Sequence, residues 1–284
     1  MRTFHVAVAA ALALVFVASP ARAADETAYG KLLDAKAPTV VSVKSVLKWA
    51  WGGGADQERN DERNGVVVDP TGVVMISNFA GSSRSSSLKI SATKIRVLFD
   101  GDEKEYDAVL GATDSKLGLA FVRVKDLAGK SISSVNFSEG VDVKIGDELF
   151  GVFRTDQGFD YAPYFAMGRI TGQVAKPRAM WILSGIGSVG APLYTTEGKV
   201  AGVVVRQAGI SEEGSSERTF LLPFKAVQGV VGQAIKASAK ALEDAKAHEA
   251  EAAAAMSEGK TDEPAGMAEE PAGMDSPPGM TDAK

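Results

Sequence analysis

The sequence predicts an all-β fold, a sandwich or barrel built from many short strands. From about residue 39 to residue 205, short segments rich in β-branched and aromatic residues recur along the chain. Turn signals separate these segments, for example Asp69-Pro70-Thr71-Gly72 and Asp100-Gly101-Asp102. No long helical period interrupts the region, which argues against an alternating α/β fold.

The predicted strands follow one another at short intervals. In order they are 40–43, 66–68, 73–77, 95–99, 120–124, 148–153 and 200–205. Two stretches are predicted to be long surface loops: residues 51–64, which are glycine-rich and then charged, and residues 81–87, which are serine-rich.

The pattern changes after Pro223. Apolar residues then recur mostly at three- and four-residue steps, which predicts an amphipathic helix over residues 223–256. The later part of that helix has an apolar face made almost only of alanine, which buries little surface. Residues 257–284 are rich in proline, glycine and acids and repeat Glu-Pro-Ala-Gly-Met, so we predict a disordered tail.

The first 23 residues are typical of a secretory signal peptide. Arg2 supplies the positive start, residues 6–17 the apolar run, and Ala21-Arg22-Ala23 a small-x-small cleavage site. A membrane anchor is the alternative, but the apolar run is short for a bilayer span. We therefore predict cleavage after Ala23 and a periplasmic or secreted protein.

Composition excludes several classes of function. The chain of 284 residues has no cysteine, which excludes disulfides, thiolate metal sites and a cysteine nucleophile. Its net charge is −5, and residues 250–284 alone carry eight acids against two lysines. The acidity therefore belongs to the tail, and no basic patch indicates a nucleic-acid partner. Nothing in the sequence indicates a cofactor or a metal.

Four segments, in the right order, resemble the trypsin-like serine proteases of the HtrA/Deg type. The resemblance covers roughly residues 38–235 and rests on Gly65–Asn78, Tyr106–Lys125, Gly187–Val205 and Phe220–Val231. It implies two antiparallel β-barrels of the chymotrypsin type, the first within residues 24–130 and the second within residues 131–222. We expect no PDZ domain of the kind common in that family, since only the acidic tail follows the predicted helix.

The resemblance also locates the positions of the catalytic triad, and all three carry other residues. The family's histidine falls on Phe79, its aspartate on Gly118 and its serine on Val189. These side chains cannot act as base, orienting carboxylate or nucleophile. The chain has two histidines, one in the predicted signal peptide and one in the predicted helix, so a shift of register supplies no histidine to the barrels.

The sequence therefore predicts a pseudoprotease, an exported trypsin-like domain that binds a peptide or protein partner without cleaving it. The predicted binding positions are Phe79, Gly187, Ser188 and Val189. In the family, the backbone N–H groups at the positions of Gly187 and Val189 form the oxyanion hole. Phe79 and Val189 either pack together in the former cleft or contact a hydrophobic ligand.

Other functions stay open. One is an HtrA-like endopeptidase with non-standard machinery, such as Ser188 or Ser184 activated by Lys199. Another is a structural or regulatory subunit, as a homo-oligomer or in association with an active protease relative.

Overall fold

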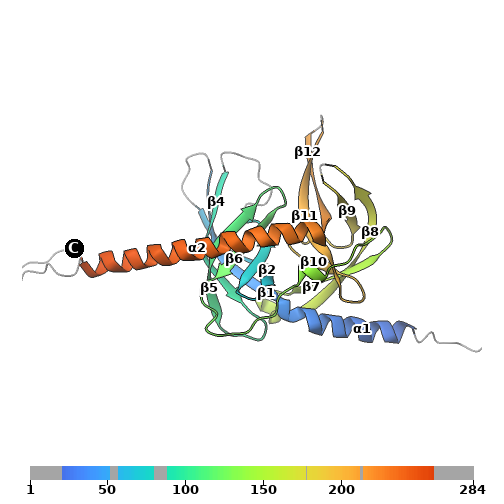
Figure 1. Ribbon diagram of the computed structural model, residues 1–284, viewed down its shortest axis with the longest axis horizontal. Helices are drawn as coiled ribbons and strands as arrows, with labels where there is room; N and C mark the ends of the chain where they lie inside the picture. The colour runs from blue at the N-terminus through green and yellow to red at the C-terminus, as the bar shows by residue number, and fades with distance from the viewer. Residues whose placement is uncertain (1–20, 52–56, 80–87, 177, 212–213, 259–284) are drawn as a thin grey trace, which may run out of the picture. The chain divides into compact units, whose positions relative to one another are not determined.

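The computed structural model describes residues 21–51, 57–79, 88–176, 178–211 and 214–258. The predicted loop at 81–87 and the predicted disordered tail from residue 259 onward lie outside these residues, as does most of the predicted signal peptide. The chain divides into two compact units at Glu243/Asp244. Both barrels belong to the first unit (Figure 1).

Six antiparallel strands close the first barrel, in the order β1-β2-β3-β6-β5-β4. Valine-rich segments of β2 and β3 pair across a tight turn at Gly72, whose φ is +93°. Glycine adopts such a left-handed conformation without strain. The strand bounds are β1 Val40–Trp51, β2 Gln57–Asp69, β3 Val73–Ser77, β4 Leu88–Leu98, β5 Glu105–Asp114 and β6 Leu119–Val124.

Six more strands close the second barrel, in the order β10-β11-β12-β9-β8-β7. The closure depends on a single register pair, Tyr194 of β10 opposite Phe150 of β7. The strand bounds are β7 Glu148–Arg154, β8 Pro163–Val174, β9 Met180–Ser184, β10 Pro192–Tyr194, β11 Val200–Ser211 and β12 Gly214–Pro223. The two closed barrels confirm the predicted double-barrel fold.

Besides the strands and three short 3-10 helices, the described residues form two α-helices. The C-terminal helix α2 spans Phe224–Glu258, where the sequence predicts one, and its first part packs on the core through Val227, Val231 and Ala234. Helix α1, Ala21–Lys36, has no counterpart among the predicted elements. It packs Leu32 and Leu33 against the core and ends just before Pro38. Within the described residues, no helix has both the length and the apolar character that crossing a membrane requires.

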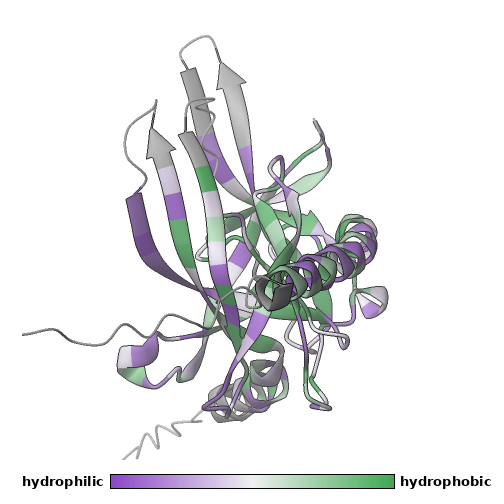
Figure 2. Ribbon diagram, turned by 90° about the vertical axis from the view of Figure 1, so that its left-hand side faces the viewer, coloured by the Kyte–Doolittle hydropathy of each residue, from purple (hydrophilic) through white to green (hydrophobic). Residues whose placement is uncertain are grey.

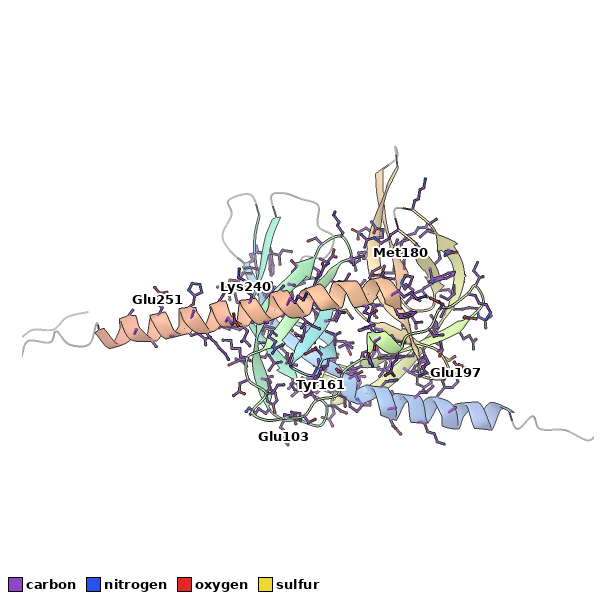
Figure 3. The ribbon with its side chains drawn as sticks, viewed as in Figure 1. Glu103, Tyr161, Met180, Glu197, Lys240 and Glu251 are labelled. Atoms are coloured by element: carbon purple, nitrogen blue, oxygen red, sulfur yellow. The ribbon has the colours of Figure 1, made fainter. Side chains whose placement is uncertain are left out.

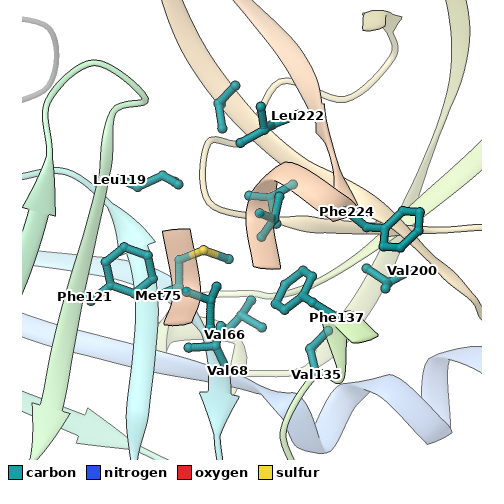
Figure 4. Close-up of a cluster of buried hydrophobic side chains, with 14 of the residues drawn as sticks. Val66, Val68, Met75, Leu119, Phe121, Val135, Phe137, Val200, Leu222 and Phe224 are labelled. Carbon is teal, nitrogen blue, oxygen red and sulfur yellow. The ribbon is translucent and has the colours of Figure 1, made fainter. Parts of the chain in front are cut away.

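Three apolar clusters form the core. One fills the first barrel, one fills the second, and the largest lies where the barrels meet. Figure 4 shows side chains of the largest cluster, including Met75 and Phe121 from the first barrel and Leu222 from the second. Phe137, in the short 3-10 helix η2 (Phe137–Glu139) of the linker, joins the same cluster. Burial of this shared cluster holds the barrels together.

The prediction of a loop at 51–64 is wrong at Trp51, which ends β1, and from Gln57 onward, while residues 52–56 lie outside the described residues. Residues from Gln57 onward form the hydrophilic half of β2, which pairs with β1 from Trp49 opposite Gln57 to Val40 opposite Val66. Figure 2 shows hydrophilic residues on these projecting strand ends. Charged residues are poor strand formers taken alone, but cross-strand ion pairs such as Lys48–Glu58 (2.5 Å) support the pairing.

Candidate functional site

The loop from Gly187 to Ala191 connects β9 to β10 and is held by backbone hydrogen bonds. The N–H of Gly190 donates to the carbonyl oxygen of Val204 (2.8 Å), and the N–H of Ala191 donates to that of Ser188 (3.2 Å). Gly190 has a φ of +90°, and a Cβ there would lie 3.0 Å from backbone atoms of Ile76 and Ser77. Glycine is therefore required, because the loop presses directly on the end of β3.

Two of the three predicted triad positions lie side by side. Gly118 has a φ of +68°, and a Cβ there would lie 3.7 Å from Cγ1 of Val189 and 3.3 Å from Cβ of Arg206. The carbonyl oxygen of Gly118 accepts a hydrogen bond from the N–H of Asn78 (2.8 Å), which ties it to the segment just before Phe79. Val189 is half-buried and packs against the cluster between the barrels.

Phe79 lies in a different environment. Its side chain is buried in the core cluster of the first barrel. The guanidinium carbon of Arg63 lies 4.7 Å from the centroid of its ring, a cation–π arrangement. Phe79 and Val189 thus belong to separate apolar clusters.

Arg63 is a site residue that sequence reasoning misses. Its guanidinium pairs with the carboxylate of Asp61, at 2.7 Å from Nε and 2.5 Å from Nη2 to Oδ2. Nη1 donates to the carbonyl oxygen of Ser77 (2.9 Å), two residues before Phe79. The available signal was an arginine directly after the two acids Asp61 and Glu62, but it falls in the stretch predicted to be a loop.

A cavity of about 260 Å³ opens beside the loop, between the two barrels. The loop contributes Ser188, which is exposed, together with Val189 and Gly190. The other walls combine apolar side chains with a few polar groups: Val40, Arg63, Asn64, Val66, Ser77, Val152, Phe153, Tyr164 and Ala191. This described lining contains no histidine, lysine or carboxylate that would serve as a general base.

The backbone N–H groups of Gly187 and Val189 have no acceptor among the described residues. In the HtrA-type resemblance these are the two oxyanion-hole donors. Val189 lines the cavity, whereas Gly187 is not among its lining residues. A backbone N–H without an acceptor is a ready donor to a ligand carbonyl or carboxylate.

A second and larger cavity, of about 740 Å³, is lined by residues of β8, β9, β11 and β12. Thr219, one of its lining residues, lies close to the loop: a Cβ on Gly187 would be 3.8 Å from the Oγ1 of Thr219. The walls of this cavity are apolar with two arginines and one glutamate: Val174, Ile182, Leu183, Arg206, Glu217, Arg218, Thr219 and Phe220.

The remaining candidates for chemistry are dispersed. Ser184 is exposed on β9, and Lys199 lies in the turn between β10 and β11, where it lines another cavity without Ser188. Of the two histidines, His5 lies outside the described residues and His248 lies in the part of α2 that belongs to the second unit. Among the described residues, no three His, Cys, Asp or Glu side chains gather as a metal site would require.

Comparison with known proteins identifies the double barrel. Residues 63–203 match the trypsin-like peptidase domain family. The solved structure of an HtrA-type protease, AlgW with a decapeptide, superposes with a TM-score of 0.50 at 17% identity, over 74% of this chain and 68% of that one. The MamO protease domain from Magnetospirillum magneticum in its apo form gives a TM-score of 0.43 at 18% identity, over 68% of this chain and 96% of that one. No curated protein sequence matches the chain.

Proposed function

This chain contains a trypsin-like peptidase domain, and we propose that the domain binds a peptide or protein partner between its barrels without cleaving it. The cavity of about 260 Å³ beside Ser188 and Val189 is the observation that carries this proposal. It combines apolar walls with a few polar groups, which is the ordinary composition of a ligand site. It offers binding groups but no base to activate a hydroxyl.

An extended peptide fits the arrangement better than a compact small molecule. The smaller cavity is lined by Val189 of the loop, and the larger one by Thr219, whose Oγ1 would lie 3.8 Å from a Cβ on Gly187. The carbonyl oxygen of a peptide crossing the loop would accept hydrogen bonds from the N–H groups of Gly187 and Val189, and the peptide would place one side chain in each cavity. Arg206 and Arg218 favour an acidic side chain in the larger cavity, although Glu217 offsets part of their charge.

The surface next to the smaller cavity is suited to a polypeptide partner. Tyr164 lines the cavity and is 46% exposed. Phe165 and Met167 on the same strand are 37% and 38% exposed, but they face the other side of the sheet and do not line the cavity. The ring of Phe165 stacks on Tyr29 of α1, with centroids 5.6 Å apart. Exposed aromatic residues beside a pocket are typical of protein interfaces. The same surface is compatible with a homo-oligomer or with assembly onto an active protease relative.

Binding to a peptide array tests the proposal, with Ser188→Trp as the blocking variant. Ser188 is exposed and lines the cavity, so an indole there fills it without disturbing the core. Ser184→Trp is the matched control, because Ser184 is exposed nearby outside the cavity lining. We expect Ser188→Trp to weaken binding at least tenfold and Ser184→Trp to leave it unchanged. Equal binding by both variants would remove the cavity from consideration.

Mass spectrometry of the bound peptides tests the absence of cleavage. We expect peptides and unfolded casein to be recovered intact and a fluorophosphonate probe to leave the protein unlabelled, since only an activated serine reacts. Cleavage that disappears in Ser188→Ala or Ser184→Ala would establish the endopeptidase alternative instead.

We propose export as the setting of this binding. The predicted cleavage after Ala23 falls in the first turn of α1, so a mature chain would begin inside that helix. N-terminal sequencing of the protein from a periplasmic or culture-medium fraction checks the cleavage. An intact N-terminus at Met1 in the cytoplasmic fraction would contradict it.

A further inference from the structure

The described lining of the cavity beside Ser188 has one charged side chain, and its charge is positive. Arg63 is that side chain, and the lining contains no carboxylate. Hydroxyl groups of Ser77, Tyr164 and Ser188 line the cavity as well. So does Val189, whose backbone N–H has no acceptor among the described residues. The cavity therefore offers several hydrogen-bond donors to a ligand and no negative charge that would repel an anionic one.

Arg63 and the loop that carries Val189 both contact Ser77. Nη1 of Arg63 donates to the carbonyl oxygen of Ser77 (2.9 Å) and, at 3.3 Å, to its hydroxyl oxygen. On the loop, a Cβ on Gly190 would lie 3.0 Å from the backbone nitrogen of Ser77. Gly190 directly follows Val189 in the chain. The charged donor and the loop with the unpaired N–H therefore meet at the same residue.

Asp61 engages Arg63 from outside the described lining of this cavity. Its Oδ2 pairs with Nε at 2.7 Å and with Nη2 at 2.5 Å. These two contacts and the two to Ser77 use four of the five N–H groups of the guanidinium, which leaves one on Nη2. A ligand carboxylate would bind this group and compete with Asp61 for the rest of the positive charge. Removal of the Asp61 charge should then strengthen the binding of such a ligand.

Buried apolar side chains form most of the remaining cavity wall, and the volume limits what they can hold. About 260 Å³ is less than the range of about 300–1,000 Å³ that is usual for sites of drug-sized ligands. The space suits one apolar side chain with a small polar group better than a run of several residues. The apolar side chains are Val40, Val66, Val152, Phe153 and Ala191.

Hydrogen bonds between the barrels hold these walls in place. Nδ2 of Asn64, which lines the cavity, donates to the carbonyl oxygen of Arg154 (2.9 Å). Nε of Arg154 donates to the carbonyl oxygen of Val40 (2.8 Å), another lining residue. Nη1 of Arg154 donates to the carbonyl oxygen of Tyr161 (3.0 Å), which is labelled in Figure 3. A ligand thus meets walls that are already ordered, which favours binding.

We propose that this cavity receives the carboxy-terminal residue of the bound peptide. Its apolar side chain packs against the buried valines and Phe153, and its α-carboxylate accepts hydrogen bonds from Arg63 and from the N–H of Val189. The inference rests on the proposed function, since it names the part of the peptide that the cavity accepts. A residue within a peptide offers only a neutral carbonyl oxygen to these donors, and a guanidinium binds a carboxylate more strongly.

Peptides that differ only at the carboxy terminus test the proposal. Binders are selected on an array that attaches peptides through the amino terminus, and each is then made as the free acid and as the carboxamide. Fluorescence anisotropy measures both against the full chain. We expect the free acid to bind at least tenfold more tightly, as the gain of charge-assisted hydrogen bonds predicts. A third form, with three glycines added before a free carboxylate, should bind as weakly as the amide, because its charge lies outside the cavity.

Variants of the arginine and its partner assign the effect to the cavity. Asp61→Asn should tighten binding of the free acid severalfold and leave binding of the amide unchanged, because it removes the carboxylate that competes for Arg63. Arg63→Gln should abolish the difference between acid and amide. Arg59→Gln is the matched control, because Arg59 is exposed on the same strand and does not line the cavity. It should keep the full preference for the acid.

The possible results separate this proposal from peptide binding itself. Equal binding of acid and amide by the unmodified chain would overturn the carboxy-terminal assignment and leave peptide binding intact. Binding of no peptide in any form would overturn both. An equal loss of preference in Arg59→Gln and Arg63→Gln would show an effect of net charge and would also overturn the assignment. Thermal unfolding checks that each variant folds, and the gain expected for Asp61→Asn cannot arise from unfolding.

Discussion

Arg154 of the second barrel donates a hydrogen bond of 2.8 Å from Nε to the carbonyl oxygen of Val40 in the first barrel. The same buried guanidinium donates to the carbonyl oxygens of Ala37 (2.9 Å) and Tyr161 (3.0 Å) and pairs with Asp100 (2.6 Å). One side chain thus joins both barrels to the segment that follows α1. Its charge is buried but fully engaged, which is the condition for keeping an arginine in an interior.

Replacing Arg154 by methionine should destabilise the protein strongly. The substitution leaves three carbonyl groups without their donor, which predicts a loss of about 3 kcal/mol or more in the free energy of unfolding. Arg169→Met is the matched control, since Arg169 is 57% exposed and pairs with Glu148 at the surface, where such pairs contribute less than about 1 kcal/mol. Urea unfolding of the two variants measures the difference. Equal losses would show that Arg154 contributes no more than a surface arginine.

The contacts of Arg154 are an example of structure that local sequence patterns do not predict. Local patterns suffice for strands such as 200–205 and for the turn at Gly72, because β-branched residues and glycine act within a few positions. Arg154 meets Val40 across 114 residues, and no local pattern indicates that pairing. The hydrophilic part of β2 was missed for a related reason, since its strand conformation depends on pairing with β1. In the loop from Gly187 to Ala191, Gly190 was predictable because its left-handed backbone conformation requires glycine.

Helix α2 meets β5 at a contact that tolerates no side chain. A Cβ on Gly111 would lie 2.8 Å from the Cα of Ser238 and would overlap its side chain. Gly111→Ala should therefore destabilise the protein by about 1–3 kcal/mol, as overpacking does. Gly229→Ala should raise stability by about 0.5–1 kcal/mol, since Gly229 lies in the same helix with open space around it. Thermal unfolding compares them, and a neutral Gly111→Ala would show that the helix shifts freely on the barrel.

Ser238 itself has a buried hydroxyl with no partner among the described residues. Ser238→Ala should accordingly leave stability unchanged or raise it slightly. This variant shows whether the hydroxyl of Ser238 contributes to stability, independently of the close contact at Gly111.

Glu105 should make part of the stability depend on pH. Its carboxylate accepts hydrogen bonds from Lys44 (2.8 Å) and Arg96 (2.9 Å), and these lower its pKa. A lowered pKa in the folded state contributes stability above the unfolded value of about 4.3, and this contribution is lost as the pH falls through the folded pKa. Because Arg96 is 49% exposed, solvent screening should limit the contribution to about 1 kcal/mol.

Glu105→Gln should therefore lose stability at pH 7 and show a flatter decline between about pH 5 and pH 3. Added salt at about 1 M should shrink the difference from the unmodified chain, because it screens the ion pairs. Glu103→Gln is the control, since Glu103 is exposed and has no ion-pair partner among the described residues. Chemical unfolding across this pH range provides the comparison. Parallel curves for the Glu105→Gln variant and the unmodified chain would contradict the prediction.

Rebuilding the family's triad with Phe79→His, Gly118→Asp and Val189→Ser should not produce a protease. Residue 118 has a φ of +68°, which is strained for a side chain, and its Cβ would lie 3.3 Å from Cβ of Arg206. A histidine at position 79 would lie under the guanidinium of Arg63, which is 4.7 Å from the present ring centroid. That positive charge lowers the pKa of a histidine and disfavours the imidazolium that must form during acylation.

Fluorophosphonate labelling and casein cleavage measure the outcome, with Val189→Ser alone as the control for folding and for an isolated serine. Both proteins should remain unlabelled. Adding Arg63→Gln to the triple variant removes the opposing charge. Any labelling that then appears would show that the charge of Arg63 had prevented activation of the serine. Labelling of the triple variant with Arg63 in place would show that the backbone retains a catalytic geometry, and that substitution of the three side chains is the whole of the difference from an active protease.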